Sequence, residues 1–158
     1  MMNLCSDLLK ALDGRTFATA ESCTGGGIGA AFTAIAGSSK VYKGGIISYT
    51  NWVKEHVLGV DAHILKEHGA VSEETAMAMA IGVRRLLQTD FAVSVTGIAG
   101  PESDEFNTPV GTVYIGLSST SRCFVKKFIF DGDRNTIRRL SVEASIKMLL
   151  GCVEGEKI

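Results

Sequence analysis

The sequence predicts a single-domain three-layer α/β/α sandwich with a mixed, mostly parallel sheet and a late β-hairpin. Short apolar runs alternate with segments of helical spacing along most of the chain, a pattern typical of strands joined by crossover helices. Two β-rich runs, 110–117 and 123–130, then follow one another with only the turn-like residues 118–121 separating them. Such a pair predicts a hairpin, so antiparallel strands should join the parallel ones.

The first part of the chain supplies the first strands and their connections. The expected elements are, in order, a helix at 3–13, a strand at 16–20, a glycine-rich turn, a helix of small residues to about residue 35, a strand at 45–49 and helices at 52–58 and 61–68. Apolar residues at helical spacing define the first helix, which stops before Asp13-Gly14. The first β-turn-α unit is therefore glycine-rich at its turn.

The second part begins with the most strongly marked helix. Ser72 precedes two glutamates and an apolar stripe that continues to about Leu87, which predicts an N-capped amphipathic helix. A compact apolar run at 91–95 predicts a buried strand. After the hairpin, Asp133 is expected to cap a final helix that closes at Gly151.

Composition excludes several classes of protein. The 158 residues, 46% of them hydrophobic, suit one globular domain over 1–158. A net charge of -1 without a polybasic run argues against direct nucleic-acid binding, and no apolar segment reaches the about 20 residues of a membrane span. The four cysteines form no Cys-x-x-Cys pair, so neither a metal site nor a disulfide framework is indicated and a reducing cytoplasm is expected.

The glycine-rich turn is the first candidate for chemistry. It places Ser22 and Cys23 side by side where a strand runs into a helix, and its main-chain N–H groups suit an anion or a developing oxyanion. A dinucleotide site is disfavoured because 44–50 contains no acidic residue. From these residues alone, either side chain is a possible nucleophile, or Ser22 or Thr24 simply caps the helix while Cys23 fills the core.

A nucleophile needs a base, and the sequence points to a lysine. The histidines lie in polar helical stretches without a metal-binding spacing, whereas Lys54 follows the end of a predicted strand. A buried lysine loses its proton more readily, because burial disfavours the charged form. The alternative is that Lys54 is a solvated charge on a helix face.

Three further segments belong to the same edge of the predicted sheet. Thr96 opens a turn with two glycines, and the acidic loop 102–108 after it is either a lid or an ordinary solvated loop. Arg134 and Arg138 lie one turn apart at the start of the last helix. They form either an anion clamp or surface ion pairs with Asp131 or Glu143.

Six blocks, in this order and spacing, resemble the CinA C-terminal domain family from about residue 4 to 150. The blocks are Ala20-Glu21-Ser22-Cys23-Thr24-Gly25-Gly26, Tyr49-Thr50-Asn51-x-x-Lys54-x-x-x-Leu58-Gly59-Val60, Gly69-Ala70-Val71-Ser72, Thr96-Gly97-Ile98-Ala99-Gly100-Pro101, Pro109-Val110-Gly111-Thr112-Val113 and Gly132-Asp133-Arg134-x-x-Ile137-Arg138. The resemblance implies a nicotinamide-nucleotide amidohydrolase of pyridine-nucleotide salvage, which deamidates nicotinamide mononucleotide to nicotinate mononucleotide and ammonia. It implies no cofactor, and it favours a homodimer.

The resemblance also implies roles for particular residues. Ser22 would be the nucleophile and Lys54 its base, with Thr96 orienting Lys54 or the amide. The substrate-binding positions implied by the match, or placed beside it by analogy, are Tyr49, Gly25, Gly26, Arg134 and Arg138. The N–H groups near the two glycines would hold the oxyanion, and Arg134, helped by Arg138, would bind the phosphate. The alternative function is a non-catalytic pyridine-nucleotide-binding module with a regulatory role in competence or DNA damage.

Overall fold

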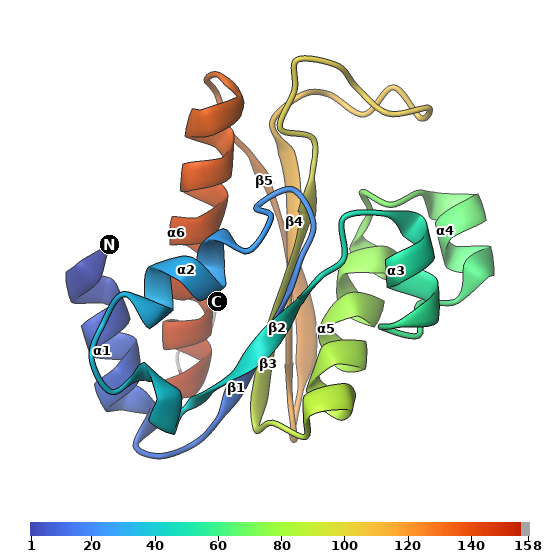
Figure 1. Cartoon of the computed structure of the whole chain (residues 1–158). Helices are drawn as coiled ribbons and strands as arrows, with labels where there is room; N and C mark the ends of the chain where they lie inside the picture. The colour runs from blue at the N-terminus through green and yellow to red at the C-terminus, as the bar shows by residue number, and fades with distance from the viewer. Residues whose placement is uncertain (156–158) are drawn as a thin grey trace.

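The computed structural model describes residues 1–155 and places one five-stranded sheet between two layers of helices (Figure 1). The strands are β1 (Phe17–Glu21), β2 (Tyr42–Ile47), β3 (Phe91–Gly97), β4 (Thr112–Ser119) and β5 (Cys123–Ile129), in the spatial order β2-β1-β3-β4-β5. β1 pairs in parallel with β2 and β3, and β4 is antiparallel to both β3 and β5. The expected three-layer fold, mixed sheet and late hairpin are confirmed.

The helices cover both faces of this sheet. In Figure 1, α1 (Met2–Leu12), α2 (Gly27–Thr33) and α6 (Arg134–Val153) lie on one side, and α3 (Asn51–His56), α4 (Ala62–His68) and α5 (Glu73–Leu87) lie on the other. A short 3-10 turn, Ser38–Lys40, leads into β2. Within residues 1–155, no helix combines the length and apolar character that crossing a membrane requires.

β1 lies between β2 and β3 and is buried along its whole length. Successive side chains of a strand point to opposite faces, so Phe17 joins the core under α1, α2 and α6, whereas Ala18 joins the smaller core under α5. Burial on both faces explains why residues 17–20 of β1 are apolar or small rather than alternating with charged residues.

The predicted caps are present, but several boundaries differ from the prediction, and for two of them the contacts give the reason. Ser72 Oγ accepts the N–H of Thr75 at 3.2 Å, and Asp133 Oδ1 accepts that of Thr136 at 2.8 Å. The strand expected at 45–49 instead spans 42–47, because parallel pairing with β1 begins at Tyr42. The last helix does not end at Gly151. It continues to Val153, because the residues after Gly151 are buried against the core.

The connections after β1 and β2 leave the sheet toward opposite faces. The chain passes from β1 to α2 on one side, and from β2 to α3 on the other (Figure 1). Open α/β sheets form a crevice outside the carboxyl ends of their strands at such a switch point. Ser22 directly follows β1, and Lys54 lies just beyond β2, so both candidate residues lie at this crevice.

Candidate active site

A pocket of about 320 Å³ lies at the carboxyl ends of the parallel strands, within the size range of small-molecule sites. Its lining residues are Ser22, Cys23, Tyr49, Lys54, Ala70, Val71, Thr96, Gly97, Ile98, Ala99, Asp104 and Arg134. They come from segments far apart in the sequence. The pocket therefore brings together a hydroxyl, a lysine and an arginine, whereas Gly25, Gly26 and Arg138 do not line it.

Ser22 and Lys54 are in direct contact. Lys54 Nζ lies 2.9 Å from Ser22 Oγ and donates a hydrogen bond of 2.6 Å to the carbonyl of Ser48. That carbonyl is held in place because Ser48 N–H donates to the carbonyl of Glu21 at 2.8 Å, which extends the pairing of β2 with β1. Ser48, which the sequence did not single out, thus orients the amine toward Ser22.

The Lys54 side chain is buried, with only 1% of its surface exposed. This excludes the alternative of a solvated charge on a helix face. Burial lowers the pKa of Lys54 from 10.5 to about 8, because the charged form loses its hydration. About a tenth of the molecules therefore carry a neutral Lys54 amine at pH 7, and that amine can accept a proton from Ser22.

The turn after β1 is anchored by Glu21, a residue that sequence reasoning did not select. The Glu21 carboxylate accepts hydrogen bonds from Thr24 Oγ1 at 2.7 Å and from the N–H groups of Ile28 and Gly29 at 2.9 Å each. A buried carboxylate requires such hydrogen-bond partners. The sequence feature that could have pointed to Glu21 is a Glu at the end of a buried strand, just before a glycine-rich helix. Glu21 already occupies the start of α2, so the N–H groups of that helix are not free for a phosphate.

The contacts and burial of Ser22 and Cys23 bear on the interpretations that the sequence left open. Ser22 does not cap α2, because Gly26 is the N-cap and Glu21 supplies the acceptors. Cys23 is buried, and burial raises the pKa of its thiol to about 11. At neutral pH the thiol is protonated and is a poor nucleophile, whereas Ser22 has a base within hydrogen-bond distance.

The expected oxyanion donors are only partly available. The Gly25 N–H already donates to the carbonyl of Ser22 at 3.1 Å. Within the described part of the chain, the N–H groups of Cys23, Thr24 and Gly26 have no hydrogen-bond acceptor. Cys23 directly follows Ser22 and lines the pocket, so two of these three free donors lie earlier in the turn than the expected Gly25 and Gly26.

Thr96 lines the pocket but does not hold Lys54. Its hydroxyl donates a hydrogen bond of 2.7 Å to the carbonyl of Ala70, and the lysine is held instead by Ser48. Of the two roles expected for Thr96, orienting Lys54 or the amide, these contacts leave the second. Thr96 Oγ1 keeps its acceptor capacity, which suits the NH₂ group of an amide.

Arg134 and Tyr49 form the mouth of the pocket. Arg134 Nη1 donates to the carbonyl of Gly100 at 2.6 Å, and Arg134 Nη2 donates to Tyr49 Oη at 3.2 Å. Tyr49 is 59% exposed and Arg134 is exposed, so the remaining guanidinium donors can meet a ligand from solvent. The surface ion pair with Asp131 that the sequence left open is not formed.

The acidic loop 102–108 folds on itself beside this mouth. Asp104 accepts hydrogen bonds from the N–H of Thr108 and from its hydroxyl, both at 2.9 Å. The ring of Phe106 lies against Gly69, where any added side chain would clash with it. The loop is thus attached to the segment before α5 and contributes Asp104 to the pocket wall.

Arg138 lies outside the pocket and contacts the turn from the side of α6. Arg138 Nε donates to the carbonyl of Cys23 at 3.0 Å, and Arg138 Nη2 donates to that of Thr24 at 3.1 Å. It makes no ion pair with Glu143, which is paired with Arg139 and Lys147 instead. The neighbouring arginines 134 and 138 therefore have different contacts, which their spacing did not reveal.

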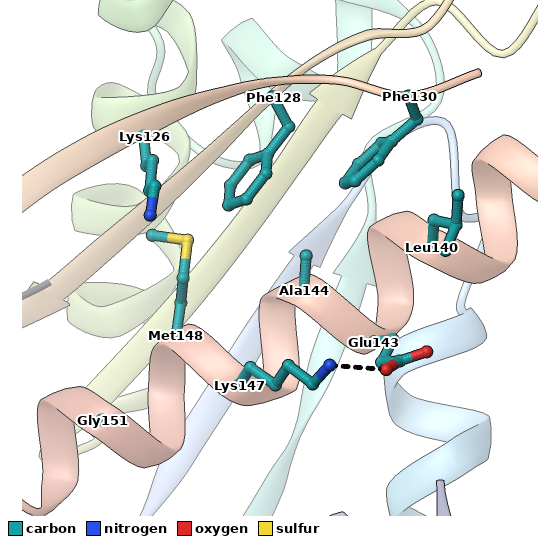
Figure 2. Close-up of a pocket in the computed structure, with 9 residues that line it drawn as sticks. All are labelled: Lys126, Phe128, Phe130, Leu140, Glu143, Ala144, Lys147, Met148 and Gly151. Atoms are coloured by element: carbon teal, nitrogen blue, oxygen red, sulfur yellow. Dashed lines mark hydrogen bonds and ion pairs between the residues drawn. The ribbon is translucent and has the colours of Figure 1, made fainter.

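A second hollow, of about 360 Å³, lies between β5 and α6. Figure 2 shows the Phe128 and Phe130 rings above Leu140, Ala144 and Met148, with the pair Lys147–Glu143 at the border. The two rings are stacked, with centroids 5.4 Å apart. Its lining contains no nucleophile beside a base, and within residues 1–155 no three His, Cys, Asp or Glu side chains gather as metal ligands.

The fold and the contacting side chains define an open α/β domain with a buried Ser–Lys pair at the switch point of its sheet. Over residues 1–153 the chain matches the CinA C-terminal domain, and it belongs to that family. A "CinA-like protein" of Geobacter sp. (strain M21) is 46% identical over 142 residues, which is 90% of this chain. A "Putative competence-damage inducible protein" of Halothermothrix orenii is 50% identical over 137 residues, or 86% of this chain. The chain spans about a third of the length of these relatives, 34% and 33%.

Solved structures of similar length share the whole fold. A competence damage-inducible protein A from Klebsiella pneumoniae superposes with a TM-score of 0.95 at 34% identity, covering 99% of this chain and 98% of that one. A competence/damage inducible protein from Agrobacterium tumefaciens has a TM-score of 0.92 at 37% identity, covering 97% and 94%. These likenesses confirm the family and the fold that the six sequence blocks predicted.

Proposed function

We propose that the chain is an amidohydrolase that deamidates nicotinamide mononucleotide to nicotinate mononucleotide and ammonia through a Ser–Lys acyl-enzyme mechanism. The observation that carries this proposal is the 2.9 Å contact between Lys54 Nζ and Ser22 Oγ in a buried setting. A hydroxyl is a weak nucleophile until a base removes its proton, and a desolvated lysine with a pKa of about 8 is such a base. The choice of a pyridine mononucleotide comes from the sequence resemblance.

The reaction begins when Ser22 Oγ attacks the carboxamide carbon and its proton passes to Lys54. The tetrahedral oxyanion accepts hydrogen bonds from the free N–H groups of the turn, of which that of Cys23 is nearest the nucleophile in sequence. The C–N bond then breaks, and the Lys54 proton leaves with the nitrogen as ammonia. Water attacks the acyl ester in the second half, Lys54 accepts its proton, and the carboxylate product is released as Ser22 is protonated again.

Recognition of the substrate phosphate falls to Arg134. Two of its five N–H donors are used by Gly100 and Tyr49, which orient the guanidinium and leave the others for phosphate oxygens. Tyr49 places its ring at the same mouth and offers a stacking surface for a planar base. Thr96 accepts from the amide NH₂ before that group departs.

A coupled ammonia assay tests the function. Wild-type protein is expected to release ammonia from nicotinamide mononucleotide fastest, from the riboside more slowly and from nicotinamide least. Ser22→Ala is the matched negative control, because it removes one oxygen atom and leaves the pocket otherwise unchanged. Ammonia release from none of the three would contradict the proposal, and tight binding of the mononucleotide without turnover would favour the binding module.

A further inference from the structure

Arg138 is half-buried and uses its guanidinium on the main chain of the nucleophile turn. It donates one hydrogen bond to the carbonyl of Cys23 and another to that of Thr24, at 3.0 and 3.1 Å. Arg139, the next residue on α6, is exposed, and its one polar side-chain contact among residues 1–155 is an ion pair of 3.8 Å with Glu143. Two neighbouring arginines of one helix thus differ in what they hold, which provides a matched control.

The geometry of the peptide group links Arg138 to the N–H donors of the turn. In a trans peptide the C=O and N–H bonds point in opposite directions, so fixing the Cys23 carbonyl toward α6 aims the Thr24 N–H away from α6. Lys54 reaches Ser22 from α3, which lies on the other side of the sheet (Figure 1). The free N–H of Thr24 is therefore directed toward the side from which the base acts.

The second bond of Arg138 fixes the following peptide. The Thr24 carbonyl accepts from Arg138 and also from the N–H of Gly27, and the Gly25 N–H on the same peptide donates to Ser22. Glu21 also holds this turn, because its carboxylate accepts a hydrogen bond from Thr24 Oγ1. A positive charge on two carbonyls also polarises their peptide groups, which strengthens the N–H donors across each bond.

We propose that Arg138 is a positioning residue that holds the Ser22–Gly26 turn so that its free N–H groups face the oxyanion, and that it is not a ligand of the substrate phosphate. The catalytic part of this inference rests on the proposed hydrolytic function. The structural part, that the Arg138 side chain orders the turn, does not depend on any substrate. The two parts are tested by separate measurements.

Amide hydrogen exchange measures the order of the turn directly. Arg138→Met keeps most of the side-chain length but removes both donors, so exchange at residues 22–27 is expected to become at least tenfold faster. Arg139→Met is the control and leaves the exchange of these amides unchanged. Arg138→Lys restores a charge and one donor, and its exchange rates are expected to lie between those of wild type and Arg138→Met. Unchanged protection of 22–27 in Arg138→Met would overturn the proposal, whether or not the wild type is active.

Steady-state kinetics separates positioning from phosphate binding. Arg138→Met is expected to lower kcat by about 10- to 100-fold, the scale of a misplaced oxyanion site, with KM changed less than twofold. The loss should be equal for the mononucleotide and the riboside, and Arg138→Lys should recover part of it. An increase of KM for the mononucleotide alone would assign Arg138 to the phosphate, and a loss that follows the unfolded fraction would make it purely structural. If the wild type releases no ammonia, the proposed function fails, while the exchange experiment still decides the role of Arg138.

Discussion

Two hollows of similar volume, about 320 Å³ at the carboxyl ends of the strands and about 360 Å³ between β5 and α6, differ in the chemistry of their walls. The first contains a buried amine against a hydroxyl, with an arginine at its mouth. The second is lined mostly by aromatic and aliphatic side chains, and its charged groups lie at the border (Figure 2). Volume and apolar character alone would favour the second hollow as a ligand site, but of the two only the first places a buried amine beside a hydroxyl.

The difference follows from where each hollow lies in the fold. Chain segments leave the sheet toward opposite faces between β1 and β2, so main-chain groups and polar side chains meet there without closing the crevice. Between β5 and α6 two regular elements pack side by side, and the hollow is only what their side chains leave unfilled. Mutations should therefore affect turnover in the first hollow and stability in the second.

The largest expected effect is that of Ser22→Ala. It should lower kcat for the mononucleotide by about 10³-fold or more, because the nucleophile itself is lost. Cys23→Ala should keep most of the activity, since burial raises the pKa of that thiol to about 11 and leaves it protonated. The measurement is ammonia release together with mass spectrometry of trapped enzyme. An acyl adduct on Cys23 would reverse the assignment.

Lys54→Met should also reduce kcat strongly, although the same change should make the folded protein more stable at pH 7. Wild-type kcat/KM should rise about tenfold between pH 7 and a plateau above pH 9, because the neutral amine becomes populated through a pKa of about 8. This pH dependence should be absent in Lys54→Met. Near wild-type turnover of this variant at pH 7 would exclude the Ser–Lys mechanism.

The same pKa shift predicts how the stability of the wild type depends on pH. Below pH 8 the folded protein buries a charged Lys54, which costs about 3 kcal/mol relative to the unfolded chain. Between about pH 8 and 10.5 the unfolded chain binds the extra proton, so raising the pH through this window stabilises the fold. Lys54→Met should therefore be the more stable protein at pH 7, by about 1 to 3 kcal/mol in urea unfolding, and should lose that advantage above pH 10.5.

Arg134→Ala should have a smaller effect that depends on the substrate. Loss of charge-assisted hydrogen bonds to phosphate should lower kcat/KM for the mononucleotide by about 10- to 150-fold, and should hardly change that for the riboside. Measuring both substrates on both proteins gives the selectivity. An equal fall for the two would show that Arg134 supports the pocket through Gly100 and Tyr49 and would remove the phosphate assignment.

The smallest effect on turnover is expected for a substitution in the hollow between β5 and α6. Phe128→Ala removes one of two stacked rings and should lower the free energy of unfolding by about 1 to 2 kcal/mol, less than for a fully buried Phe. Its kcat should stay within about twofold of wild type, because the two hollows share no lining residue. A larger loss of kcat in fully folded Phe128→Ala would show that the two hollows are coupled.

Much of the fold could be predicted from local patterns. The continuous apolar run of β1, the caps at Ser72 and Asp133 and the late hairpin all depend on neighbouring residues, and all appear as expected. The ends of the elements differ from the prediction where they depend on distant partners. Tyr42 begins β2 earlier because it pairs with Phe17, and α6 continues past Gly151 because the residues beyond it are buried.

The sequence by itself determined the order of the elements, and it placed a hydroxyl, a glycine-rich turn and a lysine just beyond the ends of strands, where a parallel sheet puts its sites. Only the tertiary structure decided what those groups can do. Lys54 has a lowered pKa because burial removes its hydration, and Ser48 aims its amine at Ser22; Arg138 holds the turn because α6 brings it to two carbonyls. Desolvation and hydrogen-bond direction arise between segments distant along the chain, so no local pattern records them.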